Sequence, residues 1–351
     1  MNKLFTLLML WMLSCLPSLA QAPMDGGVWK DNTGKHINAH GGNIFNYKGT
    51  YYWYGESRSA DGKPYSSLGV SCFTSKDLKK WTNHGLVLPV TDEPGSDIEG
   101  GCIIERPKVL YNQKTKKFVM WFHLELKGRG YGAARYGVAT SDTPFGPFKF
   151  IRSGRVNPGI YPVGFSKPDT TDLKHQLLFP ELKAWWTPEW RKQIERGMFW
   201  MRDFEGGQMS RDMTIFIDDD GKAYHIYSSE DNLTLQIAQL TDDYMQHNGS
   251  YVRVAAGGQN EAPTIFKQDG IYWMITSGCT GWAPNAARLF KAKNIYGPWE
   301  QLANPCRGEG ANKTFGGQGT FIYKVETAAQ KKMFHGADYV FMADMWNPKQ
   351  L

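Results

Sequence analysis

The 351-residue sequence predicts an all-β fold, built as a five-bladed β-propeller. One observation is a pattern that occurs about five times, in which a small or polar start leads into an apolar strand, a Gly/Asp turn and an aromatic strand. A second observation is an outer element after several of the copies, as in SKDLKKWTNHG, TPFGPFKF, TDDYMQHNG and IYGPWEQL. A hairpin followed by two further strands, repeated along the chain, is typical of propeller blades.

Each copy of the pattern reads as a hairpin because of its turn residues and alternation. In chain order the copies are Asn38 to Glu56, the segment from Glu105, Ser210 to Asp231, the segment from Glu261, and Gly316 to Val325. Glu105 and Glu261 both stand one residue before an X-Pro step. A residue that precedes proline favours extended backbone, so each glutamate is expected at the start of a strand.

Two regions depart from the repeat. Residues 161–207 contain PELKAWWTPEWRKQIERGMF, which predicts a short amphipathic helix inserted between blades two and three, as a candidate wall for a pocket. The last copy leads to YVFMAD and then to the final residues, so we expect blade five to lack its outer strands unless residues 28–37 close the ring.

The N-terminus predicts a secretory signal peptide over residues 1–22. Lys3 precedes an apolar run that is too short to span a bilayer, and a small-residue Ala-Gln-Ala site follows. The propeller domain then covers residues 23–351, in a secreted or periplasmic protein. Leu13-Ser14-Cys15 is also a loose lipobox, so a lipid anchor at Cys15 is an alternative. The other cysteines, Cys72, Cys102, Cys279 and Cys306, are expected to be buried thiols, with Cys279 and Cys306 the best-placed pair for a disulfide.

Composition and charge limit the classes of partner that the protein is expected to bind. The formal net charge is +6, but the basic residues are scattered and form no stripe of the kind that binds nucleic acid. The aromatic fraction of 14% suits a β-rich core or stacking on sugar faces. We therefore expect an oligo- or polysaccharide partner, no nucleic acid, no membrane span and a monomer. No metal-ligand spacing is present and no cofactor is expected, although the central channel leaves room for a structural calcium ion.

The starts of the inner strands define a candidate site. The first strand of each blade lines the central channel, so residues at its start converge at one end. Taken singly, each such residue has a plain alternative role in capping strand-end amides. Crowded carboxylates push their pKa values apart, and a protonated acid beside ionised neighbours is what cleavage of a glycosidic bond requires. The residues found at these starts are His40 or Gly41, Glu105, Asp212, Glu261 and Gln318.

Several motifs give the chain a specific resemblance over nearly all of the mature sequence. They are INAHGG, YYWYGE, the Glu-Arg-Pro step, SRDMTIFIDDDGKAY, YSSEDN, NEAPTIF, SGCTGW and KTFGGQ. The sequence resembles glycoside hydrolase family 43, in the branch that contains exo-β-1,3-galactanases and related β-galactosidases. The resemblance implies an inverting, exo-acting enzyme that removes terminal β-galactosyl residues.

The resemblance also implies roles for individual residues. Glu261 matches the catalytic acid, Asp212 the aspartate that orients it and tunes its pKa, and Gln318 the glutamine that holds the attacking water. The aspartate that usually serves as base has no counterpart at Ala39-His40-Gly41-Gly42, a loss that is also seen in the galactanase branch. The positions assigned to the terminal sugar are Glu56, Glu105, Tyr131, Thr280, Trp282 and His40, although for Trp282 core packing is nearly as good an interpretation as stacking on the sugar ring.

Two alternatives stay open from the sequence. An α-L-arabinofuranosidase or β-xylosidase would share the family, but the missing aspartate of blade one argues against it. A sugar-binding propeller without catalysis would tolerate loss of the acid, whereas this chain carries both Glu261 and Asp212.

Overall fold

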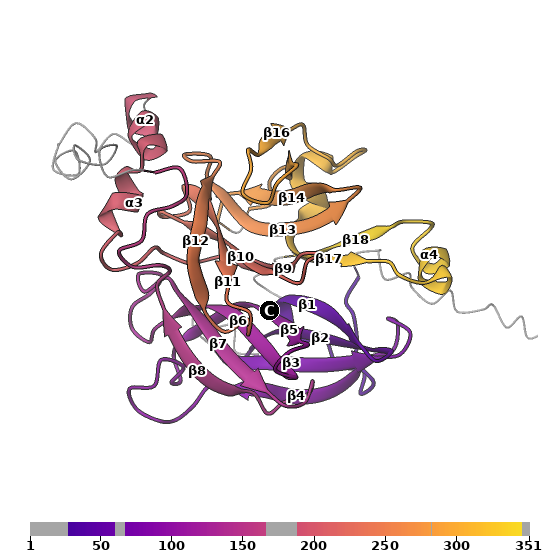
Figure 1. Cartoon of the computed structure of the whole chain (residues 1–351). Coiled ribbons are helices and arrows are strands. Elements are labelled where there is room, and N and C mark those ends of the chain that lie inside the picture. Colours follow the sequence, from indigo (N-terminus) through magenta and orange to yellow (C-terminus); the bar gives the residue numbers. More distant parts are fainter. Residues whose placement is uncertain (1–26, 60–66, 166–187, 282, 346–351) are drawn as a thin grey trace, which may run out of the picture.

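The structure, a computed structural model, describes residues 27–59, 67–165, 188–281 and 283–345. Within these ranges the chain is mostly strand, and the first strands of the sheets gather near the centre of the molecule (Figure 1). The arrangement is a β-propeller, which confirms the predicted all-β class. The proposed signal peptide, Cys15 and Trp282 lie outside the described residues.

Four sheets have four antiparallel strands each, in simple sequence order. Blade one is β1 (His40–Tyr47), β2 (Thr50–Arg58), β3 (Ser67–Ser75) and β4 (Thr82–Pro89), and blade two is β5 (Ile103–Asn112), β6 (Lys117–Glu125), β7 (Arg135–Ser141) and β8 (Lys149–Gly154). Blade three is β9 (Met213–Ile217), β10 (Ala223–Ser229), β11 (Thr234–Leu240) and β12 (His247–Val254), and blade four is β13 (Asn260–Gln268), β14 (Ile271–Gly278), β15 (Arg288–Ala292) and β16 (Glu300–Leu302).

The blade count corrects the prediction of five. The described residues form four four-stranded blades, and the last copy of the pattern forms only a two-stranded sheet, β17 (Gly317–Lys324) with β18 (Tyr339–Met345). Strand β17 packs against both β1 and β13, so the inner strands still surround a common centre. Residues 28–37 fold back on themselves through a bridge between Lys30 and His36, and no pairing of theirs with β18 is present in the described part of the chain.

The apolar core lies between adjacent blades. Blades one and two bury Tyr54, Met120 and Phe122 between them, and blades two and three bury Trp121 and Tyr227. Burial of such aromatic faces removes a large apolar area from water. Each inner strand also contacts the inner strand on either side of it, so its position is fixed by two neighbours.

A bulge recurs at the start of the inner strands. The pairing register shifts after His40 in β1, after Glu105 in β5 and after Glu261 in β13. The next residues, Gly41, Arg106 and Ala262, have left-handed backbone with φ of 62°, 54° and 50°. The expectation of extended backbone before Pro107 and Pro263 is therefore wrong, because the bulge imposes a left-handed residue at both places. The bulges thus fall directly after His40, Glu105 and Glu261, three of the residues expected at the channel end.

The insert between blades two and three is partly helical, as predicted. It contains α2 (Pro188–Arg196) and α3 (Met198–Arg202), which lie at the periphery (Figure 1). A further helix, α4 (Ala328–Met333), and a 3₁₀ segment, η3 (Ala311–Gly316), flank β17. None of the described helices has the length and apolarity needed to cross a bilayer.

The four described cysteines are all free thiols, so the Cys279–Cys306 pairing does not form. Cys72 and Cys102 are buried, as expected, while Cys279 and Cys306 are partly exposed. Burial raises the pKa of the Cys72 thiol to about 12, which keeps it protonated and unreactive at neutral pH.

Candidate active site

Arg106 joins two of the residues that the sequence placed at the channel end, Asp212 and Gln318. Its guanidinium donates to both carboxylate oxygens of Asp212 at 3.1 Å, to Oε1 of Gln318 at 2.5 Å and to the carbonyl of Gly319 at 2.6 Å. Arg106 is 4% exposed. A planar fork of donors suits several acceptors at once, which explains why an arginine rather than a lysine stands between blades two and three and the last sheet.

Glu261 is partly buried and lies beside the group formed by Arg106, Asp212 and Gln318. The backbone N–H of Ala262 donates to Oδ2 of Asp212 at 3.0 Å, which fixes Asp212 next to Glu261. Burial, followed by the negative charge of Asp212, raises the pKa of Glu261 to about 7, although Arg106 and a hydrogen bond from Asn232 act to lower it. A carboxyl with such a pKa is in part protonated near neutral pH, as a general acid requires.

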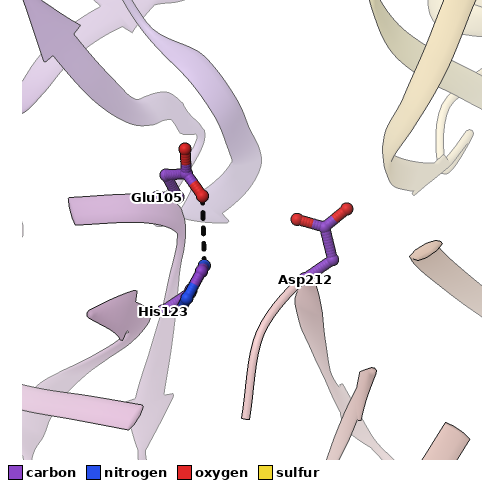
Figure 2. Close-up of side chains that lie close together, drawn as sticks. All are labelled: Glu105, His123 and Asp212. Atoms are coloured by element: carbon purple, nitrogen blue, oxygen red, sulfur yellow. Dashed lines mark ion pairs between the residues drawn. The ribbon is translucent and has the colours of Figure 1, made fainter. Parts of the chain in front are cut away.

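Glu105, in contrast to Glu261, is held in its ionised form. Its carboxylate accepts from the Tyr131 hydroxyl at 2.8 Å and from Arg58 at 3.2 Å, and it forms an ion pair with His123 Nδ1 at 3.1 Å. Figure 2 shows this pair, with the Asp212 carboxylate facing the same space. Burial acts to raise the pKa of Glu105, but the contact with His123 and the other partners lowers it to about 2. Glu105 is therefore an anion at neutral pH.

His123, on β6, lies between the carboxylates of Glu105 and Glu125. Its Nε2 lies 2.9 Å from Oε1 of Glu125, a side chain that also accepts the backbone N–H groups of Ala133 and Ala134. Burial acts to lower the pKa of His123, yet the bonds to Glu105 and Glu125 raise it to about 9. An imidazolium has no lone pair for a metal. Although Glu105, His123 and Asp212 offer ligand atoms within 4.8 Å of one another, the donor set favours an ion-pair network over a cation site.

The His123 pair predicts a pH dependence of stability. A histidine whose pKa is raised from 6.5 to about 9 on folding stabilises the protein fully below pH 6.5, and this contribution is lost as the pH rises to 9. We expect the free energy of unfolding to fall across this window by on the order of 3 kcal/mol. In His123→Asn the decline should be clearly shallower, measured by urea unfolding at several pH values. An equally steep decline in His123→Asn would contradict the assignment of the imidazolium.

Glu56 is a second buried carboxyl, on β2. Oε1 accepts from Arg58 at 3.0 Å, and burial raises the pKa of Glu56 to about 8. Oε2 is buried and has no hydrogen-bond partner among the described residues. Near neutrality Glu56 is thus largely protonated and Glu105 is ionised, so the two side chains offer a donor and an acceptor side by side.

The other predicted residues fall in different places. His40 lies at the start of β1, and burial lowers its pKa, which favours the neutral imidazole. Tyr131 joins the site through Glu105. Thr280 is exposed, and its hydroxyl donates to the Ala283 carbonyl at 2.6 Å, within its own loop. That loop shares a small cavity with Gln318, whose Nε2 donates to Ser277 Oγ at 3.0 Å.

A cavity of about 1420 Å³ lies beside this cluster rather than over it. It separates β1 and residues 27–37 from the sheet β17–β18, and its wall is mainly apolar. His40 and Asp344 reach it, whereas Glu261 and Asp212 do not line it. Asp344 pairs across the sheet with Gln318, and its Oδ2 accepts the Gly41 N–H at 2.6 Å.

Sequence reasoning missed Arg106, His123, Glu125, Asn232 and Asp344. Arg106 was visible inside the Glu-Arg-Pro step, directly before the proline of the bulge. His123 and Glu125 share the two-residue period of β6, which places both side chains on one face of the strand. Asn232 and Asp344 end the stretches YSSEDN and YVFMAD, but the pattern does not show that either reaches the site, because each does so through tertiary contacts.

Comparison with known proteins identifies relatives of this chain. The sequence model of the glycosyl hydrolases family 43 matches residues 188–340. A curated relative, the β-D-galactofuranosidase xynD of Aspergillus niger, is 22% identical over 239 residues, which are 67% of this chain and 55% of that protein. The chain therefore spans about half the length of that relative.

Solved structures are more similar. The family 43 β-1,3-galactosidase BT3683, solved with galactodeoxynojirimycin, is 57% identical with a TM-score of 0.85, over 93% of this chain and 91% of that one. The exo-β-1,3-galactanase 1,3Gal43A from Clostridium thermocellum is 36% identical with a TM-score of 0.71, over 92% of this chain and 58% of that one.

Proposed function

The chain belongs to glycoside hydrolase family 43, and from that premise we propose that it is an exo-acting hydrolase that removes terminal β-galactosyl residues from β-1,3-galactan or related side chains. The observation that carries this proposal is the carboxyl set at the channel end. Glu261, with a pKa of about 7, lies beside Asp212, and Glu105 is held as an anion. One carboxyl that can give a proton and a second that stays charged suit cleavage of a glycosidic bond.

Glu261 serves as the general acid in this proposal. Its proton passes to the glycosidic oxygen as the bond to the leaving group breaks, and Asp212 keeps that proton available at neutral pH by its negative charge. Arg106 holds Asp212 in place by donating to both of its carboxylate oxygens. Asp212 acts on the acid and does not itself touch the bond that is cleaved.

Gln318 is assigned to holding the attacking water. Arg106 fixes its oxygen and Ser277 fixes its nitrogen, so its amide plane is set before substrate arrives. Arg106 also occupies a lone pair of the amide oxygen, which makes this side chain better suited to orienting water than to keeping its proton. The proton that the water loses as it bonds to the anomeric carbon passes through a proton relay to bulk solvent. An inverting reaction, with water and acid on opposite faces of the sugar, fits this placement.

The terminal sugar is assigned to Glu56, Glu105 and Tyr131, with His40, Thr280 and Trp282 in supporting contacts. A protonated Glu56 next to an ionised Glu105 can bind a donor and an acceptor hydroxyl of one pyranose. The hydroxyl of Thr280 would have to leave its bond to Ala283 in order to take part. Secretion by the proposed signal peptide belongs to the same proposal.

Asp212→Asn is expected to move the basic limb of the pH profile of kcat/KM to lower pH. The charge of Asp212 raises the pKa of Glu261, so its loss allows Glu261 to ionise earlier as the pH rises. Asp219→Asn is the matched control, since Asp219 is 85% exposed in the same blade. A limb that stays in place in Asp212→Asn would show that Asp212 is structural only.

The sugar is tested with a panel of aryl glycosides and a digest of β-1,3-galactan. Preference for β-D-galactopyranoside, with galactose released from the polymer, supports the proposal. Preference for α-L-arabinofuranoside, β-D-xyloside or β-D-galactofuranoside would reassign the substrate within the family. Binding of galactose without hydrolysis of any substrate would favour a sugar-binding propeller.

A further inference from the structure

The turn between β10 and β11 is strained. Glu230, Asp231 and Asn232 have φ of 52°, 56° and 64°. Three successive non-glycine residues in left-handed backbone are unfavourable for L-amino acids, and such a run persists only where its surroundings hold it. We call residues 230–232 the strained turn.

Glu230 is fixed by a buried arginine. Arg253 donates to Oε1 at 2.6 Å and to Oε2 at 2.7 Å, and the two side chains are 4% and 0% exposed. The same guanidinium donates to the carbonyls of Ile194 at 2.6 Å and Glu195 at 2.9 Å, in the last turn of α2. One side chain therefore ties the strained turn to the inserted helix.

Two further contacts join the insert to this turn. Arg202 of α3 pairs with Asp231 at 2.5 Å. Leu233, the residue directly after the turn, is buried in a small apolar cluster with Trp190, Ile194 and Met198 from the two helices. The insert thus contacts the residue on either side of Asn232, Asp231 through Arg202 and Leu233 through the apolar cluster.

Asn232 is the residue of the strained turn that reaches the candidate acid. Its Nδ2 donates to Oε1 of Glu261 at 2.7 Å. We propose that α2 and α3 form a buttress, with Arg253 as its linking residue, which holds the strained turn so that Asn232 positions the carboxyl of Glu261. This inference rests on the proposed role of Glu261 as the acid, and it gives the insert a positioning role distinct from that of a pocket wall.

The buttress has a kinetic consequence with a defined sign. A hydrogen bond donated to a carboxylate favours its ionised form and lowers its pKa. Release of Asn232 therefore raises the pKa of Glu261 and moves the basic limb of kcat/KM to higher pH. Loss of Asp212 moves the same limb to lower pH, so the two effects are opposite in sign.

The test removes the buried pair without changing net charge, in Glu230→Gln/Arg253→Gln. We expect the basic limb to rise by on the order of one pH unit, because a hydrogen bond to a charged group has about that effect on a pKa. The control is Arg191→Gln/Glu195→Gln, an exposed Arg–Glu pair on the outside of α2 with N–O distance 3.0 Å. The control should keep the wild-type profile.

A double-mutant cycle tests whether the buried pair acts on Glu261 by positioning Asn232 or by its own electric field. Asn232→Ala alone should shift the limb upward, and adding Glu230→Gln/Arg253→Gln to it should add little. A folded pair variant with an unshifted limb, or shifts that simply add, would overturn the inference. If the pair variant does not fold, Arg253→Lys replaces it and should give a smaller shift of the same sign, and an unshifted limb there would again overturn the inference.

Hydrogen exchange gives a second readout that needs no activity. The Leu233 N–H is bonded to the Glu230 carbonyl at 3.1 Å, and it should exchange at least about tenfold faster in the pair variant than in the control. Equal exchange would contradict the buttress. A wild-type protein that cleaves no β-galactoside would instead overturn the proposed function, while the exchange result would still decide the buttress.

Discussion

Replacing Glu261 with glutamine is expected to lower kcat/KM on β-1,3-galactan by on the order of 10²–10⁴. The amide has nearly the same shape, so it keeps the hydrogen bond from Asn232 by its oxygen, but it has no proton to give to the leaving oxygen. Binding of galactose should persist. The effect should be much smaller on aryl galactosides with acidic leaving groups, which depart without protonation.

The matched control is Glu300→Gln, in the same blade, where Glu300 is 64% exposed and pairs with Lys291. It should behave as wild type. Near-normal turnover of galactan by Glu261→Gln would remove Glu261 from the mechanism, and an equal loss on every leaving group would point to misfolding of the site rather than to loss of an acid.

Replacing Arg106 with methionine should lower both activity and stability. Asp212 and Gln318 would lose the group that holds them, and a displacement of about 1 Å at a catalytic group costs on the order of 100-fold in rate. Asp212 would also be left as a partly buried charge without its partner, and breaking a buried pair costs about 3–5 kcal/mol.

Arg135→Met is the control for Arg106. Arg135 is in the same blade and pairs with Asp97 at 3.0 Å, but both side chains are about one-third exposed, so little stability should be lost. Chemical unfolding and kcat would be measured for both variants. Wild-type kcat in a folded Arg106→Met would contradict the central place given to this guanidinium.

The site was predictable where it depends on the repeat. Glu105 and Glu261 are found from the sequence because both precede an X-Pro step, and the structure explains the step as a bulge in which proline needs no ladder partner. Gln318 follows from the same position in the last copy. The predicted number of blades was wrong because a hairpin pattern indicates two strands only. It does not indicate whether two further strands pair outside them.

The rest of the site depends on contacts that no local pattern encodes. Asn232 reaches Glu261 only because the strained turn is held by Arg253, about twenty residues further along the chain. The charge of His123 follows from two carboxylates, that of Glu105 on the neighbouring strand β5 and that of Glu125 two residues along β6. Left-handed backbone at Arg106 and Ala262 runs against the local preference, since tertiary packing overrides it there.

The most direct test of the proposed exo-acting, inverting hydrolysis is a time course on a β-1,3-linked galactose hexamer, followed by proton NMR. We expect galactose and the pentamer as the first products, with galactose appearing first as the α-anomer and reaching its equilibrium mixture later. Early release of dimers to tetramers would contradict exo action, and galactose appearing first as the β-anomer would contradict inversion.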